Sequence, residues 1–109
     1  MTAPIAVNAL SFAHEVLSSS LPVFIDVTAE WCPPCKAAAP VVEELAQRHA
    51  CRLKVVVIDG DKAPDLAAML GVRGFPTFLG MLDGEIVARQ AGFGGKRGLE
   101  TFVQELLEL

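Results

Sequence analysis

Two short apolar runs flank one long helical segment, and this order constrains the fold more than any other feature of the chain. Residues 23–27 and 53–58 are rich in apolar and β-branched side chains, which is typical of strands covered on both faces. Between them, residues 33–49 predict a helix that Pro40 should kink. A strand, a helix and a second strand in this order predict parallel strands joined by a helical crossover.

The C-terminal part of the chain predicts a hairpin followed by a helix. Residues 77–82 and 85–91 flank Asp83 and Gly84, a dipeptide that favours a tight turn between antiparallel strands. The segment after Gly95 places its apolar side chains on one side of a helix. These apolar positions are Leu99, Phe102, Val103, Leu106 and Leu107.

Three shorter elements complete the predicted order. We expect a strand in residues 5–10, a helix in residues 11–17 capped by Ser11, and a helix that Pro64 opens and Gly71 closes. The sequence therefore predicts an α/β fold with one mixed sheet, parallel early and antiparallel in its C-terminal hairpin, with helices on both faces. No linker or repeat interrupts residues 1–109, so we expect a single domain.

Composition and charge argue against several kinds of partner. The net charge is −4 and the nine Lys and Arg residues are scattered, so we expect neither a nucleic acid nor a membrane surface as partner. No basic segment followed by a long apolar core and no stretch of membrane-spanning length is present, so we expect a cytoplasmic protein. The three cysteines do not resemble a secreted disulfide framework. We expect a working monomer.

The Cys32-Pro33-Pro34-Cys35 segment at the start of the 33–49 helix predicts redox chemistry. The helix dipole favours a thiolate at the cap by roughly 0.3–1 kcal/mol, so the pKa of Cys32 should fall by somewhat under about one unit. Because the thiolate attacks disulfides, Cys32 is the predicted nucleophile. Cys35, one turn further in, should be more buried and act as the resolving thiol. Since Pro33 and Pro34 lack an N–H, the backbone N–H of Cys35 is the nearest donor to the Cys32 sulfur.

A zinc site is the alternative for the same cysteines, with His49 and Cys51 as further ligands. A helix over residues 35–49 would separate Cys35 from His49 by about 20 Å, so zinc requires that this helix be absent. We expect no metal and no bound cofactor. Cys51 is interpreted as a structural residue, and His14 and His49 as residues of helix surfaces.

Asp26 lies inside the first apolar run, shortly before the cysteines. One interpretation is a carboxylate that faces solvent at the end of the sheet. We favour a buried carboxyl group whose pKa is raised by desolvation, so that near neutral pH it exchanges a proton with Cys35.

Three aromatic residues lie in loop-like stretches beside Gly or Pro, and they fit two roles. Trp31, Phe75 and Phe93 are either core residues or an apolar platform for a polypeptide near the nucleophile. Pro76 follows Phe75 at the entrance of a predicted strand. Cis bonds make up only about 5–6% of X–Pro bonds in folded proteins, so these residues alone predict a trans bond.

The chain resembles the thioredoxin family along almost its whole length. The matching residues are Asp26, Ala29-Glu30-Trp31-Cys32, Pro34-Cys35-Lys36, Ala39-Pro40, Asp61, residues 71–77, Asp83-Gly84 and Gly92. The resemblance implies a thioredoxin fold and a protein-disulfide reductase, in which Cys32 attacks, Cys35 resolves and Asp26 is the buried proton partner. A flavoprotein thioredoxin reductase or another dithiol donor would recycle it. The resemblance also implies that Pro76 is cis, and it implies a substrate groove lined by Trp31, Gly74, Phe75, Pro76, Gly92 and Phe93.

Four residues depart from the family pattern. Pro33 replaces the usual glycine, as in tryparedoxin-like and nucleoredoxin-like relatives, and Thr28 replaces an aromatic residue. Val57 replaces a lysine beside Asp26, which should raise the pKa of that carboxyl group further. Gly60 removes an apolar side chain from the groove. Two alternatives to a reductase stay open. One is a protein-disulfide oxidant or isomerase, since a stiffer Pro33-Pro34 loop would shift the balance between the oxidised and reduced forms. The other is a non-catalytic thioredoxin-fold binding module that uses the apolar groove as a docking surface.

Overall fold

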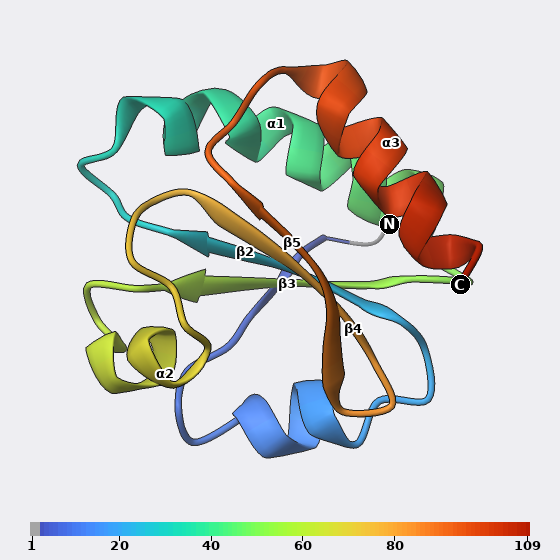
Figure 1. The fold of residues 1–109 in the computed structure, drawn as a ribbon, viewed down its shortest axis with the longest axis horizontal. Helices are drawn as coiled ribbons and strands as arrows, with labels where there is room; N and C mark the ends of the chain where they lie inside the picture. Colours follow the sequence, from blue (N-terminus) through green and yellow to red (C-terminus); the bar gives the residue numbers. More distant parts are fainter. Residues whose placement is uncertain (1–2) are drawn as a thin grey trace.

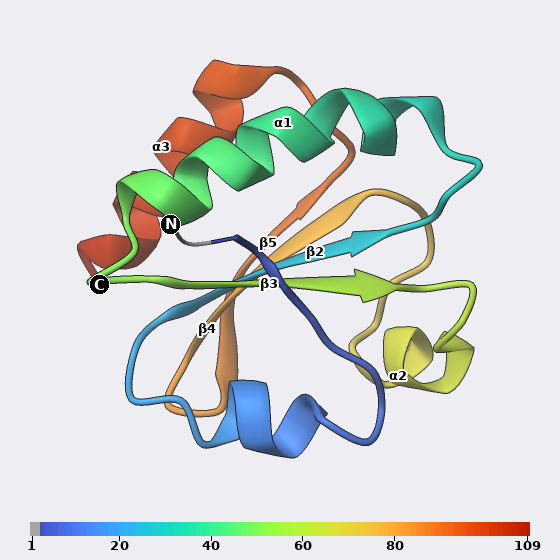
Figure 2. The same cartoon turned by 180° about the vertical axis from the view of Figure 1, so that it is seen from behind.

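The computed structural model describes residues 3–109, which form a mixed five-stranded sheet with helices on both faces (Figures 1 and 2). The strand order is β1-β3-β2-β4-β5. The strands are β1 (Ile5–Ala6), β2 (Val23–Thr28), β3 (Lys54–Asp59), β4 (Thr77–Leu82) and β5 (Glu85–Ala91). The first three in chain order pair in parallel, whereas β4 runs antiparallel to β2 and β5 antiparallel to β4. The predicted mixed α/β sheet is confirmed.

The helices divide between the two faces of this sheet. Helices α1 (Pro33–Arg48) and α3 (Lys96–Leu107) cover one face, while α2 (Pro64–Met69) and the short η1 (Ala13–Leu17) cover the other (Figure 1). Side chains alternate along a strand, so Phe24 of β2 faces α1 whereas Ile25 faces α2. Each face therefore has its own hydrophobic core.

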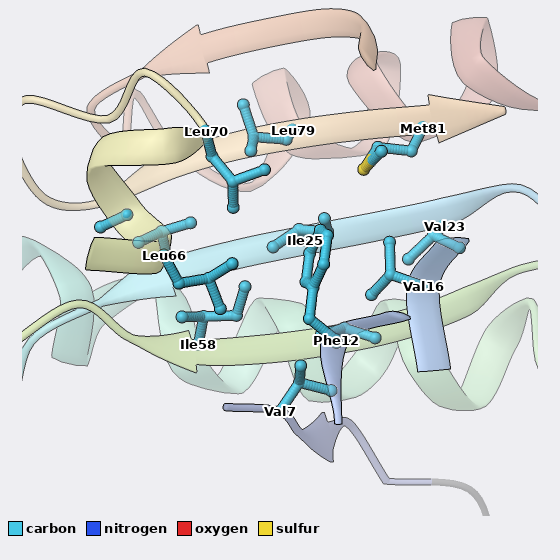
Figure 3. Close-up of a cluster of buried hydrophobic side chains, with 13 residues drawn as sticks. Val7, Phe12, Val16, Val23, Ile25, Ile58, Leu66, Leu70, Leu79 and Met81 are labelled. Carbon is cyan, nitrogen blue, oxygen red and sulfur yellow. The ribbon is translucent and has the colours of Figure 1, made fainter. Parts of the chain in front are cut away.

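Both cores are mainly aliphatic, but three aromatic rings pack together only in the core on the α1 face. On the α1 face, the ring of Phe24 stacks on Phe78 at 5.7 Å and meets the edge of Phe102 at 5.6 Å. On the α2 face, aliphatic side chains from β2, β3 and β4 pack against η1 and α2 (Figure 3). Every aliphatic or aromatic side chain that α3 was predicted to bury lies in or against the α1-face core.

The N-terminal elements differ from the predicted ones. Strand β1 covers only Ile5–Ala6 because the chain turns at Asn8, whose side-chain oxygen accepts hydrogen bonds from the N–H groups of Leu10 and Ser11. The Ser11 hydroxyl accepts from the Asn8 N–H and does not cap a helix.

The helix predicted in residues 11–17 is a single π-type turn. Its backbone bond runs from the N–H of Ser18 to the oxygen of Ala13, five residues earlier, at 3.1 Å. Phe12 precedes this turn and is buried in the α2-face core. The apolar spacing located the element correctly, but it did not show this hydrogen-bonding pattern.

The predicted turns are confirmed by backbone geometry. Asp83 and Gly84 both have positive φ, 51° and 80°, which is the conformation that a two-residue hairpin requires. Gly71 follows α2 with φ of 76°, as expected for the glycine after a helix. Helix α1 begins at Pro33 and ends before His49, and it contains Pro40 in its interior.

Candidate active site

A disulfide joins Cys32 and Cys35 at the start of α1, with their Cα atoms 5.2 Å apart. Cys32 is the N-cap residue, and the backbone N–H of Cys35 donates to Cys32 Sγ at 3.3 Å. This is the donor that the two prolines predicted. It directs the positive end of α1 at the sulfur of Cys32.

The expected difference in burial between the two cysteines is wrong. Cys32 is 2% exposed and Cys35 is 3% exposed, so exposure does not distinguish them. The reason is that Ala29 and Phe75, from two different loops, pack over this small cluster and cover Cys32 as well. Position and not exposure distinguishes the two sulfurs, because Cys32 caps α1 whereas Cys35 lies within its first turn.

The loop before β4 faces the disulfide. Cys32 Sγ lies 3.6 Å from the carbonyl oxygen of Phe75, and the Phe75–Pro76 peptide bond is cis, as the family resemblance implied. A Cβ atom added to Gly60 would overlap the ring of Phe75. The volume left empty by Gly60 is therefore occupied by the Phe75 ring, so the residue types at positions 60 and 75 are physically coupled.

Trp31 lies on the surface beside this loop and is not a core residue. It is 65% exposed, and its ring meets that of Phe75 edge-on at 6.0 Å. Its indole N–H donates to the carboxylate of Asp61. Sequence reasoning did not place Asp61 in the site. The topology could have done so, because the carboxyl ends of the parallel strands β2 and β3 lie at the same edge of the sheet.

A groove of about 330 Å³ opens next to Phe75. Three further residues of the predicted groove line it, namely Gly74, Pro76 and Gly92, and the N–H of Gly92 donates to the Pro76 oxygen at 2.8 Å. Sequence reasoning missed the other five lining residues, which are Gly71, Arg73, Thr77, Arg89 and Ala91. Phe93 is not among the residues that line this groove; it is partly buried and packs against the α1-face core.

Asp26 is buried on the sheet face that α1 covers. It is 3% exposed, and its neighbours across the sheet are Val57 on β3 and Phe78 on β4. Its Oδ1 atom has no hydrogen-bond partner within residues 3–109. Burial among apolar side chains raises the pKa of Asp26 to about 7. The structure thus supports the interpretation of Asp26 as a buried carboxyl group, and it places Val57 beside it as the resemblance implied.

The remaining cysteine and the histidines lie elsewhere. Cys51 is an exposed free thiol, so its interpretation as a structural residue is wrong. His14 is exposed, and burial together with nearby arginines lowers the pKa of the half-buried His49. Within residues 3–109, no group of three or more His, Cys, Asp or Glu side chains could hold a metal ion. The α1 helix that the zinc alternative required to be absent is present.

Comparison with known proteins agrees with this geometry. The family model described as Thioredoxin matches residues 3–105. The chain belongs to the thioredoxin family. It is similar to the thioredoxin of Mycobacterium tuberculosis, with 44% identity over 98 residues that cover 90% of this chain and 84% of that protein. It is also similar to Thioredoxin 1 of Synechococcus elongatus, with 41% identity over 92 residues, 84% of this chain and 86% of that protein. Similarity to Thioredoxin 1 of a Nostoc species extends over 107 residues at 36% identity, covering 98% of this chain and all of that protein.

These thioredoxin relatives, together with the Cys32–Cys35 disulfide, identify the activity. The protein is a thiol–disulfide oxidoreductase of the thioredoxin type that reduces protein disulfides. The family, fold and activity predicted from the sequence are confirmed. No helix in residues 3–109 is long and apolar enough to cross a membrane.

Proposed function

We propose that Cys32 is the attacking thiol of this thioredoxin-family reductase. Its thiolate attacks one sulfur of a substrate disulfide, forming a mixed disulfide and releasing the other substrate sulfur as a thiolate that takes up a proton. The Cys35 thiolate then attacks Cys32 Sγ, which closes the Cys32–Cys35 disulfide and releases the second substrate thiol. Two electrons pass from the protein to the substrate.

The observation that carries this proposal is the hydrogen bond from the Cys35 N–H to Cys32 Sγ at the cap of α1. A donor in this position stabilises a thiolate on Cys32, and the helix dipole acts in the same direction. Cys32 also lies against the Phe75 loop that borders the groove, whereas Cys35 is held within α1. Both features favour Cys32 as the sulfur that meets a substrate.

Asp26 is proposed as the proton partner of Cys35. A carboxyl group whose pKa is about 7 is partly protonated at neutral pH, so it can take or give a proton without a large free-energy difference. Asp26 lies on the sheet face beneath α1, and Cys35 is a buried residue in the first turn of that helix. Removal of the proton from Cys35 would activate it for the resolving step.

The substrate polypeptide is proposed to lie in the groove lined by Gly74, Phe75, Pro76 and Gly92 and to extend over Trp31, whose ring meets that of Phe75. Phe93, which packs against the α1-face core, is not part of this proposed surface. Residues 1–109 are proposed to act as a single domain and as a monomer, since each apolar core closes within the chain. We further propose a cytoplasmic protein recycled by a flavoprotein thioredoxin reductase. The free Cys51 thiol supports a reducing compartment.

Two single substitutions test the roles of the cysteines, both in a Cys51→Ser background that removes the exposed free thiol. Cys35→Ser should accumulate a mixed disulfide between Cys32 and a protein substrate such as insulin, detected by non-reducing electrophoresis and peptide mass. Cys32→Ser should trap nothing and lose disulfide reduction. Trapping of the substrate on Cys35 would reverse the proposed roles.

The direction of electron flow is tested by equilibration with glutathione buffers. A reductase keeps its Cys32–Cys35 disulfide under strongly reducing glutathione ratios, and acid quenching followed by thiol alkylation measures the oxidised fraction. Reduction of this disulfide at mild ratios would instead indicate an oxidant or isomerase.

A further inference from the structure

Two arginines give the groove beside the active site a positive wall. Arg73 and Arg89 both line it, together with Phe75 and Pro76, and no Asp or Glu is among its lining residues. None of the ion pairs within residues 3–109 includes either arginine. This local charge is opposite in sign to the net charge of the chain, which is −4.

Arg89 is held in place by backbone oxygens. Its Nη2 donates to the Leu70 oxygen at 2.8 Å and its Nη1 to the Gly71 oxygen at 3.3 Å, both at the C-terminal end of α2. A cation at this end of a helix is stabilised by the dipole. The guanidinium group has five N–H donors, and these two bonds leave others free for a ligand. Because its orientation is already fixed, Arg89 loses little conformational freedom when it binds an anion.

The groove adjoins the reactive sulfur. Phe75 lines the groove, and its carbonyl oxygen lies 3.6 Å from Cys32 Sγ. An extended polypeptide advances about 3.3 Å per residue. When the cysteine of a substrate reaches Cys32, a side chain about three residues or fewer from that cysteine can therefore lie in the groove. A side chain that fits an apolar floor and two guanidinium groups has a short aliphatic stem and a carboxylate.

We propose that this groove selects substrate polypeptides that carry Asp or Glu within about three residues of the cysteine under attack, with Arg73 and Arg89 binding the carboxylate. The inference rests on the proposed role of Cys32 and adds a class of substrate to it. Phe75 lines this cationic subsite. Its ring occupies the space that a side chain at position 60 would need, and it also meets the ring of Trp31.

The test uses pairs of disulfide-linked peptides that are identical except for Glu or Gln at each position up to three residues from the cysteine. The protein is kept reduced with dithiothreitol, and kcat/KM is measured from the release of peptide thiol. For the best position, we expect the Glu peptide to react about fivefold faster than the Gln peptide at low salt. This preference should fall towards one at high salt, because ions screen exposed charge pairs.

Substitutions assign the preference to the arginines. Arg73→Gln and Arg89→Gln should each lower the Glu/Gln ratio, and the double variant should abolish it. Arg73 is exposed and makes no side-chain hydrogen bond or ion pair within residues 3–109, so its variant should fold even if Arg89→Gln destabilises the end of α2. Arg97→Gln, which removes a positive charge from α3 outside the groove, is the matched control and should keep the wild-type ratio.

The outcomes separate this inference from the proposed function. Equal reduction of the Glu and Gln peptides at every position would overturn the carboxylate subsite while leaving the role of Cys32 intact. A preference that persists in the double variant would also overturn it. Failure to reduce any peptide would count against the proposed function itself. General electrostatic attraction cannot produce the expected result, because a chain with net charge −4 repels acidic peptides.

Discussion

The wild-type protein should lose stability as the pH rises and Asp26 ionises, and replacing Asp26 by Asn should prevent this loss. The folded protein raises the pKa of this carboxyl group from 3.8 to about 7 by burying it. Because the folded state then holds the proton more tightly, the stabilising contribution is complete below the unfolded pKa and is lost as pH rises to the folded one. A shift of about three pKa units corresponds to about 4 kcal/mol of stability lost between about pH 4 and about pH 8.5.

The measurement is the free energy of unfolding in urea for the oxidised protein at these two pH values. Asp26→Asn leaves amide donors and acceptors buried, which costs about 1–3 kcal/mol, but that cost does not depend on pH. The wild-type protein should therefore lose about 4 kcal/mol more than the variant over this range. Other titrating groups, such as His49, are present in both proteins and cancel in the difference.

Asp65→Asn is the matched control, because it removes one carboxylate from the exposed first turn of α2 without touching the buried group. It should retain the wild-type loss of stability. Equal pH dependence for wild type and Asp26→Asn would refute the reasoning, since it would mean that the carboxyl group has the same proton affinity in the folded and unfolded states.

Two further substitutions test the packing around the site. Gly60→Ala should lower the free energy of unfolding by about 1–3 kcal/mol, because it forces the Phe75 ring to move. Adding Phe75→Val should restore most of this stability, and independent, additive effects of the two substitutions in urea unfolding would contradict the coupling. Phe78→Ala should cost about 3–5 kcal/mol, because it empties a fully buried site beside Phe24, and an unchanged urea midpoint would contradict this.

Most of the fold was predictable from local sequence signals. Asp83 and Gly84 were predicted to form a tight turn and Gly71 to end a helix, and all three residues have the positive φ that these positions favour. Strands β4 and β5 occupy the predicted residues, since turn residues mark where they begin and end. The predictions for the N-terminal strand and for the cap at Ser11 were wrong because Asn8 and Ser11 bond to each other. These side-chain to backbone hydrogen bonds turn the chain, which ends the strand early and occupies the Ser11 hydroxyl.

The parts of the site that were not predictable depend on contacts between distant segments. The burial of Cys32 comes from Phe75, which lies 43 residues away in the chain. The hydrogen bond from Trp31 to Asp61 and the contact of Arg89 with the end of α2 are also long-range. Periodicity and residue type carry no information about such contacts. Only the folded structure, which brings Asp61 to Trp31 and Arg89 of β5 to the end of α2, reveals them.

Asp26 shows why the sequence still identified the centre of the site. All four remaining positions of β2 from Val23 to Val27 are apolar and buried, so a carboxyl group at position 26 contradicts the local pattern. If Asp26 faced solvent at the end of the sheet, the contradiction would vanish, but the register places it between Val57 and Phe78. A buried group that lowers stability above neutral pH and lacks a hydrogen bond at Oδ1 is not explained by folding. The proposed role as a proton exchanger beneath the first turn of α1 accounts for such a group, because burial raises the pKa of Asp26 to about 7, where it can both take and give a proton near neutral pH.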